Sequence, residues 1–191
     1  MLRPWRASDR APFAALNADP RVMRYLGPPL ARAASDALAG RIEAHFAEHG
    51  FGMWAVEVRG VAEFVGIVGL GVARFEAHFT PCVEVAWRLA AAHQGCGYAT
   101  EAARAALRFG FEELALAEIV ALTTRENSAS RAVMGRLAMQ HNPRDDFEHP
   151  ALAPGNPLRP HVLYRISSGT FLDVCSRMPG DVLSPIPGVI S

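Results

Sequence analysis

The stretch Gln94-Gly95-Cys96-Gly97-Tyr98-Ala99 lies between an apolar run, Val83–Leu89, and an alanine-rich segment that begins near Thr100. The apolar run predicts a strand and the alanine-rich segment, to about Glu113, predicts a helix, so the six residues form the connecting loop. Glycines in such a loop permit a tight turn. They also let backbone N–H groups at the helix start approach phosphate oxygens, which the helix dipole favours. The stretch therefore predicts either an ordinary tight turn or a site for a phosphorylated ligand.

The composition describes one globular domain without a global charge. The chain has 191 residues, of which 50% are hydrophobic and 20% are charged, and this is enough for one substantial core. Nineteen basic and nineteen acidic residues give a formal net charge of +0, so no basic field draws the protein to nucleic acid. Any anion site must therefore be local.

The cysteines and the N-terminal residues indicate the compartment. Cys82, Cys96 and Cys175 are far apart and form no C-x-x-C pair, so neither a disulfide framework nor a metal site is expected. The first residues lack the apolar core of a signal peptide, and no stretch approaches the roughly 18 apolar residues that a membrane helix needs. We expect a soluble, cytoplasmic protein that binds neither metal nor membrane.

The first half of the chain changes from helical to extended patterns. A short strand at Leu2–Trp5 precedes three segments with helical spacing or caps, which are Ser8–Leu16, Val22–Tyr25 and Leu30–Glu48. Period-two and β-branched runs follow and predict three consecutive antiparallel strands, which are Phe51–Val58, Ala62–Leu70 and Val83–Leu89.

The second half predicts a change of strand direction. After the helix that follows the glycine loop, Ile119–Thr124 predicts a short buried strand and Asn127–Leu137 another helix. A strand, helix, strand order implies parallel pairing with a right-handed crossover. The expected class is therefore a mixed α/β sheet, an antiparallel meander that becomes parallel just past the glycine loop.

The remaining residues predict a loop, one strand and a tail. Asn142–Pro160 is rich in proline and is expected to be a loop, and His161–Ile166 returns to strand character. Residues 167–191 contain no alanine in an alanine-rich protein. We expect one domain over residues 1–166 and a tail outside the fold over residues 167–191.

The order of these elements and several motifs resemble the GNAT acetyltransferases, most closely the RimJ/RimL-type branch, whose named members acetylate the N-termini of ribosomal proteins. The motifs are Gln94-x-x-Gly97-x-Ala99, the run Gly97–Ala103, and Asn127-Ser128-Ala129-Ser130 after the next strand. Leu2–Trp5, Asp19–Met23 and His161–Tyr164 are also similar to that branch. The resemblance covers roughly Leu2 to Ile166.

This resemblance implies a GNAT fold with acetyl-CoA in a cleft between the splayed fourth and fifth strands, Val83–Leu89 and Ile119–Thr124. It implies that the pyrophosphate lies on the glycine loop and that the pantetheine arm pairs with the fourth strand. The cofactor-binding residues that it implies are Ala86, Trp87, Leu89, Gln94, Gly95, Cys96, Gly97, Tyr98, Ala99, Asn127 and Ser130.

The implied reaction moves an acetyl group from acetyl-CoA directly to a primary amine, either a protein N-terminus or a small molecule, in a ternary complex. Many members carry a tyrosine one turn into the helix after the fifth strand, where this chain has Val133 and Met134. Ser130 is therefore the candidate that protonates the departing thiolate. An ordinary helix cap is the alternative interpretation of Asn127 and Ser130.

The general base has several candidates. Glu84 lies near the position of a catalytic or water-organising glutamate in the family, although a carboxylate on a strand can also be merely solvated. Glu148 and His149, or His141, are alternatives in the later loop. Direct transfer needs no covalent intermediate, so Cys96 is not expected to be a nucleophile.

The sequence bears on two other function classes. A GNAT-fold module that binds CoA without turnover is the alternative to an enzyme, because the tyrosine is missing and the base is uncertain. A nucleotide-binding domain of another kind is disfavoured, because no G-x-x-x-x-G-K-[ST] motif occurs. A homodimer is compatible with the sequence, and the acceptor cannot be identified from it.

Overall fold

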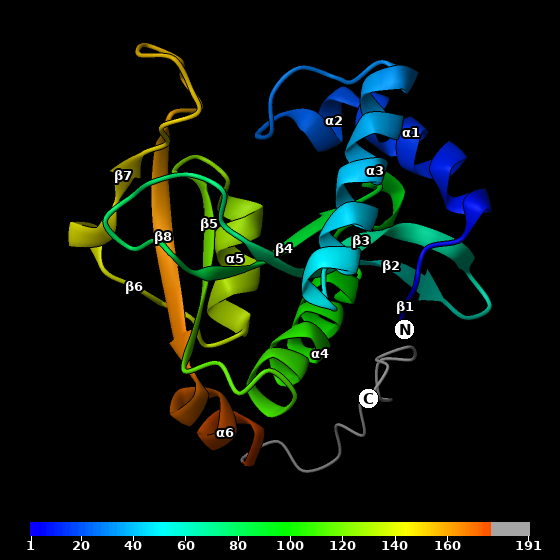
Figure 1. The fold of residues 1–191 in the computed structure, drawn as a ribbon. Coiled ribbons are helices and arrows are strands. Elements are labelled where there is room, and N and C mark those ends of the chain that lie inside the picture. The colour runs from blue at the N-terminus through cyan, green and yellow to red at the C-terminus, as the bar shows by residue number, and fades with distance from the viewer. Residues whose placement is uncertain (177–191) are drawn as a thin grey trace.

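One sheet organises residues 1–176, which are the part of the chain that the computed structural model describes (Figure 1). Within these residues the sheet has eight strands: seven follow the order β1-β2-β3-β4-β5-β8-β6, and the eighth, β7, pairs with β8. The strands are β1 (Leu2–Arg3), β2 (Met53–Val58), β3 (Ala62–Val72), β4 (Val83–Leu89), β5 (Glu118–Thr124), β6 (Gln140–His141), β7 (Phe147–Glu148) and β8 (Pro160–Ser167). Neighbours are antiparallel except β4 and β5, which are parallel. The predicted fold class is therefore confirmed.

The helices have recognisable local causes. They are α1 (Arg10–Ala18), α2 (Pro20–Met23), α3 (Arg32–His49), α4 (Tyr98–Glu112), α5 (Ser128–Arg136) and α6 (Ser168–Ser176). Proline occupies the first position of α2, and the Asp19 carboxylate caps this helix by accepting a hydrogen bond from the Arg21 amide at 2.9 Å. The end of α3 is set by Gly50, whose φ of +76° is left-handed and favours glycine.

The sheet is buried on both faces. Neighbouring residues on a strand point to opposite faces, so Ile67 and Val68 of β3 enter different apolar clusters. Val68 packs in the cluster that α4 covers with Leu107, and Ile67 packs with Phe13 of α1 and Ile42 of α3. Figure 1 shows α1, α2 and α3 grouped beside the β2–β4 half of the sheet, whereas α5 lies beside β5. The face under α1–α3 and the face under α4 and α5 are thus two separate environments.

The two parallel strands separate soon after they meet. The register between β3 and β4 runs from Val83 to Leu89, whereas within the described residues the register between β4 and β5 joins Glu84 to Val120 and no further pair. Most of the β4 edge that faces β5 is therefore free of sheet pairing. This separation positions the site described below.

The structure refines the predicted boundaries. The strand expected at Val83–Leu89 has those bounds, and α4 begins two residues before Thr100, at Tyr98. Most of Asn142–Pro160 is irregular as predicted, but the expectation of a loop is wrong at Phe147–Glu148, which form β7. A strand of two residues is too short to leave a periodic pattern.

The chain continues in regular structure after β8. Part of the segment that the sequence predicts to be a tail, Ser168–Ser176, forms α6. Phe171 of this helix is 3% exposed and packs against Phe111, with ring centroids 5.1 Å apart. The rest of the predicted tail, residues 177–191, lies outside the described residues. No helix in residues 1–176 combines the length and the apolar character needed to cross a membrane.

Candidate functional site

A cavity of about 550 Å³ opens where β4 and β5 separate. β4 contributes the unbroken run Val85–Leu89, β5 contributes Leu122 and Thr123, and α2, α4 and α5 supply other walls. Because successive side chains on a strand point to opposite faces, lining by an unbroken run means that the cavity reaches both faces of the sheet. Its volume lies in the range of small-molecule sites.

The glycine loop forms one end of the cavity. The Gln94 side chain donates a hydrogen bond from Nε2 to the carbonyl oxygen of Leu89 at 2.9 Å, which ties the loop to the end of β4. Gly95 and Gly97 have left-handed φ values of +77° and +85°. A Cβ atom at either position would meet nothing within 4 Å, so the backbone conformation, and not crowding, favours glycine here. The space beside both glycines is open to a ligand.

The start of α4 presents unpaired backbone donors at this loop. The helix begins at Tyr98 and runs for 15 residues, so the amides of Tyr98 and Ala99 have no acceptor within it. Unpaired amides and the positive end of the helix dipole together favour a bound anion. Cys96 is exposed, its thiol donates a weak hydrogen bond to the Gln94 carbonyl at 3.6 Å, and it does not line the cavity.

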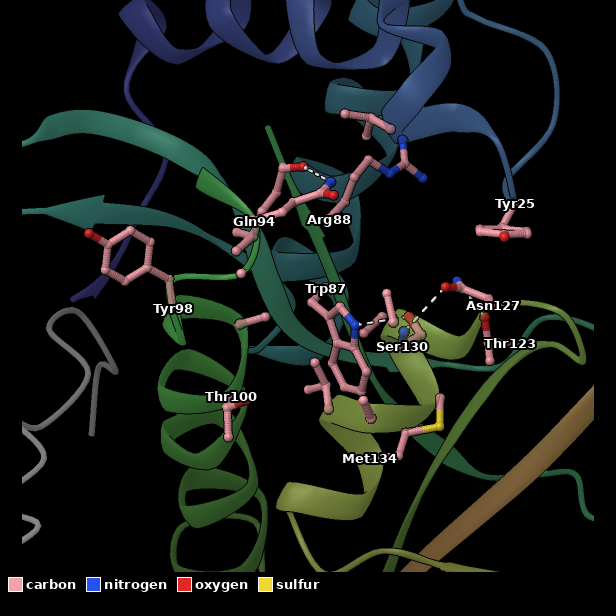
Figure 2. A pocket seen from close by; sticks show the side chains of 18 of the residues that line it. Tyr25, Trp87, Arg88, Gln94, Tyr98, Thr100, Thr123, Asn127, Ser130 and Met134 are labelled. Carbon is pink, nitrogen blue, oxygen red and sulfur yellow. Dashed lines mark hydrogen bonds between the residues drawn. The ribbon is translucent and has the colours of Figure 1, made fainter. Parts of the chain in front are cut away.

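Trp87 and Ser130 both line the cavity and contact each other. The indole Nε1 donates a hydrogen bond to Ser130 Oγ at 3.1 Å, and Figure 2 shows the two side chains facing each other between β4 and α5. The Ser130 oxygen thus accepts a bond, and its own O–H is left to donate elsewhere. Met134, one turn further along α5, lines the wall beneath them.

Asn127 holds the start of α5. Its Oδ1 accepts a hydrogen bond from the Ser130 amide at 3.2 Å, and its Nδ2 donates to Thr123 Oγ1 at 2.9 Å. This is the helix cap that the sequence offers as an alternative interpretation of Asn127, and it places the residue on the cavity wall. The Nδ2 group has a second N–H bond, which the Thr123 contact does not use.

Glu84 lies just outside the lining residues but points to the same face as Ala86, because alternate residues of a strand share a face. Its side chain crosses Gly71 of β3, and within residues 1–176 its carboxylate has no hydrogen-bond or ion-pair partner. Burial therefore raises the pKa of Glu84 to about 7. A carboxyl with this pKa exchanges its proton near neutral pH.

The alternative bases lie apart from the cavity. Glu148 pairs with Arg159 at 3.1 Å and is exposed, and His149 packs against Phe75 with ring centroids 4.6 Å apart. His141 stacks on Tyr164 and contacts Asp146 at 2.7 Å through Nε2. The lining residues include none of Glu148, His149 and His141.

Tyr25 and Arg88 are among the lining residues that the sequence did not identify. Tyr25 follows α2 and lies across the cavity from Asn127 in Figure 2, and Arg88 points from β4 toward the α1–α2 segment. The signal for Arg88 was present, since a lone arginine interrupts the otherwise apolar end of a strand. The position of Tyr25 depends on how α2 packs, which the local sequence does not specify. Among residues 1–176, no group of three or more His, Cys, Asp or Glu side chains could hold a metal ion.

Sequence comparison assigns most of the chain to a known family. The model of the family described as "Acetyltransferase (GNAT) domain" matches residues 1–140. A curated relative, the FsC-acetyl coenzyme A-N(2)-transacetylase of Aspergillus fumigatus, is 38% identical over 96 residues, which are 48% of this chain and 40% of the relative. The matches span roughly half the length of the curated relatives, between 40% and 54%.

Solved structures share the fold. Spermidine N-acetyltransferase from Vibrio cholerae, in complex with CoA and spermine, has a TM-score of 0.70 and 20% identity, and the alignment covers 90% of this chain and 97% of that one. RimJ of Mycobacterium smegmatis, in complex with CoA-disulfide, has a TM-score of 0.65 and 22% identity, with 92% and 88% covered. Both branches fit the fold to a similar degree, so the fold does not select the RimJ/RimL-type branch.

Proposed function

Because the chain belongs to the GNAT acetyltransferase family, we propose that it transfers an acetyl group from acetyl-CoA to a primary amine. The observation that carries this proposal is the cavity that crosses the sheet between β4 and β5, with unpaired helix amides at one end. Each substrate would occupy one face of the sheet. The acceptor would be a protein N-terminus or a small molecule, and the RimJ/RimL-type branch, a cytoplasmic location and a homodimer stay predictions.

The residues around the glycine loop fit the donor. Acetyl-CoA, when bound, supplies an activated acetyl group as a thioester. The amides of Gly95, Cys96, Gly97, Tyr98 and Ala99 would donate to its pyrophosphate oxygens, which requires no basic patch in a neutral protein. The free edge of β4 from Ala86 to Leu89 would pair with the pantetheine amides as an added strand does. The CoA complexes of the two solved relatives support this assignment.

Ser130 would act as the proton donor to the departing sulfur. Its oxygen accepts the Trp87 N–H at 3.1 Å, and a hydroxyl that accepts a hydrogen bond becomes a stronger donor through its own proton. Asn127 fixes the helix start that carries Ser130. The cap of α5 thereby positions the proposed acid.

Glu84 would act as the base toward the amine. Its pKa of about 7 leaves a substantial carboxylate fraction at neutral pH. Its side chain points to the same face of the sheet as Ala86, opposite to Trp87. An α-amine, with a pKa near 8, needs less help than a lysine amine near 10.4. Orientation of the amine would supply a further share of the rate.

A CoA-binding module without turnover is the second candidate. It is favoured by Val133 and Met134, which line the cavity where many members of the family carry a tyrosine. Met134 is 1% exposed, so this position is filled by a packed thioether and not by a phenol.

Thiol release from acetyl-CoA in the presence of primary amines tests both candidates. We expect turnover by the wild-type protein and a large loss in Ser130→Ala and Glu84→Gln. Ser128→Ala, at the exposed first residue of α5, and Glu63→Gln, at an exposed residue near the start of β3, are matched controls, because neither residue lines the cavity. If acetyl-CoA raises the melting temperature but no amine increases thiol release, the proposal of an enzyme is rejected and that of a CoA-binding module without turnover is kept.

A further inference from the structure

Arg88 brings a guanidinium into the cavity without an acidic partner. Its Nη1 donates to Oδ1 of Asn17 at 2.5 Å, and Nδ2 of Asn17 donates to Ser35 Oγ at 2.9 Å. Asn17 and Ser35 are both fully buried and both neutral. This chain of hydrogen bonds fixes the direction of the guanidinium but does not neutralise it.

The charge of Arg88 is uncompensated within residues 1–176. Its Nε is enclosed without a hydrogen-bond partner, and Nη2 makes no hydrogen bond and is not fully enclosed. Burial lowers the pKa of Arg88 to about 10, so the group is still cationic at neutral pH. Arg21, which also lines the cavity, differs because it is exposed and pairs with Asp19 at 2.7 Å. A buried charge without a partner is unfavourable, and an anionic ligand would relieve it.

The position of Arg88 assigns this anion to the acceptor and not to the phosphates. Arg88 and Ala86 share one face of β4, whereas Trp87 points to the other face, where it meets Ser130. Figure 2 shows Arg88 directed toward the α1–α2 segment, away from Ser130. The amides at the start of α4 already provide for phosphate oxygens.

We propose that Arg88 binds a carboxylate of the acceptor, so that the acceptor is a primary amine that also carries a carboxylate, as an amino acid does. A guanidinium with unused N–H bonds is a strong donor to a carboxylate. The same charge repels a polycationic amine. This inference rests on the proposed acetyl transfer and specifies its substrate class.

Matched amine pairs test the proposal. Glycine, L-methionine and L-phenylalanine are compared with their amides in the thiol-release assay, and spermidine is included as a polycation. We expect kcat/KM for the carboxylate member of at least one pair to exceed that of its amide about tenfold or more, as for a hydrogen bond to a charged group. The neighbouring carboxylate keeps more of the amine protonated, so this preference would run against amine basicity. Equal rates within every pair, a preference for the amides or for spermidine, or no turnover of any amino carboxylate while another amine reacts would overturn the proposal.

Substitutions separate recognition from folding. Arg88→Gln is expected to abolish the carboxylate preference and leave the KM for acetyl-CoA within about twofold, and Arg88→Lys to retain part of the preference. Asn17→Asp places a carboxylate at the existing contact with Arg88 and so neutralises its charge from within the protein. It should remove the preference for carboxylate acceptors while the melting temperature stays the same or rises. Arg10→Gln, which removes a partly exposed arginine that pairs with Glu43 and does not line the cavity, is the control. A preference that survives Arg88→Gln and Asn17→Asp, or an Arg88→Gln effect confined to acetyl-CoA, contradicts the proposal.

Binding without chemistry distinguishes this proposal from the proposed function. The CoA-saturated protein is titrated calorimetrically with the three amino acids and with their amides. If an amino acid binds in a way that depends on Arg88 but no amine is turned over, the carboxylate site is supported and the proposal of acetyl transfer is rejected. If amines are turned over at rates that do not depend on the carboxylate, acetyl transfer is supported and the carboxylate site is rejected. If no amino acid binds and none turns over, the carboxylate site is also excluded.

Discussion

The indole N–H of Trp87 on β4 donates to the hydroxyl oxygen of Ser130 on α5, across 3.1 Å of the gap where the sheet divides. The contact joins the strand and the helix that flank the cavity. It also orients the hydroxyl, because an oxygen that accepts a hydrogen bond from the indole N–H directs its own O–H away from Trp87.

Removal of the Ser130 hydroxyl is expected to slow the chemical step. Ser130→Ala should lower kcat about 100-fold with little change in the KM for acetyl-CoA, because a positioned proton donor acts on the leaving group. Trp87→Phe, which removes the N–H but keeps an aromatic ring, should give a smaller loss in kcat. Steady-state thiol release measures both, and a kcat within twofold of wild type in Ser130→Ala would exclude the serine as the acid.

The pH dependence of the rate should report the Glu84 carboxyl. Burial raises the pKa of Glu84 to about 7, so the basic form accumulates as the pH rises from 6 to 8. The ratio of wild-type to Glu84→Gln kcat should therefore increase across this range. The ratio cancels the ionisation of the amine itself, which is common to both proteins. A ratio that stays flat between pH 6 and pH 8 would remove Glu84 as the base.

The same carboxyl should make stability depend on pH. The folded pKa of Glu84 is about 7 against an ordinary value of 4.5, so the folded state holds the proton more tightly than the unfolded chain. Its contribution is fully present below pH 4.5 and is lost as the pH rises through 7. Relative to Glu84→Gln, the wild-type free energy of unfolding should fall by about 2 to 3 kcal/mol between pH 4.5 and pH 8. Urea unfolding at several pH values measures this difference. If the free energies of unfolding of the wild type and of Glu84→Gln change in parallel with pH, the prediction is contradicted.

The glycine loop should be sensitive to conformation and not to volume. Gly97→Ala places a side chain at φ +85°, where nothing lies within 4 Å, so the substitution strains the backbone and redirects the amides at the start of α4. We expect a tenfold or larger rise in the Kd for acetyl-CoA. Gly155→Ala is the matched control, because Gly155 has φ +83°, equally open space and no place in the cavity wall. Calorimetric binding of acetyl-CoA compares the two, and an equal effect in both would assign the loss to strain alone.

The fold was predictable where the signals are local. The run Val83–Leu89, the glycines of the next loop and the alanine-rich helix each carry a pattern within a few residues, and their order determines the parallel step between β4 and β5. The cap at Asn127 was equally readable, since Asn and Ser three residues apart form a common helix start.

The site was less predictable because its contacts are distant in sequence. Arg88 meets Asn17 across 71 residues, and this contact exists only because α1 packs on the face of the sheet to which Arg88 points. The alternation of β4 gives the direction of Glu84 but not what covers it. The sequence therefore left open whether this carboxylate is solvated, whereas in the structure burial raises its pKa. Tyr25 likewise reaches the cavity through the packing of α2.

The unbroken lining run of β4 has a consequence for how such an enzyme changes over evolutionary time. Even-numbered side chains of the strand, such as Glu84, Ala86 and Arg88, face one compartment, and odd-numbered ones, such as Val85 and Trp87, face the other. Substitutions in one set therefore leave the other set in place. If the proposed assignment of the two faces holds, a single strand can diversify the molecule that receives the group while it preserves the molecule that delivers it.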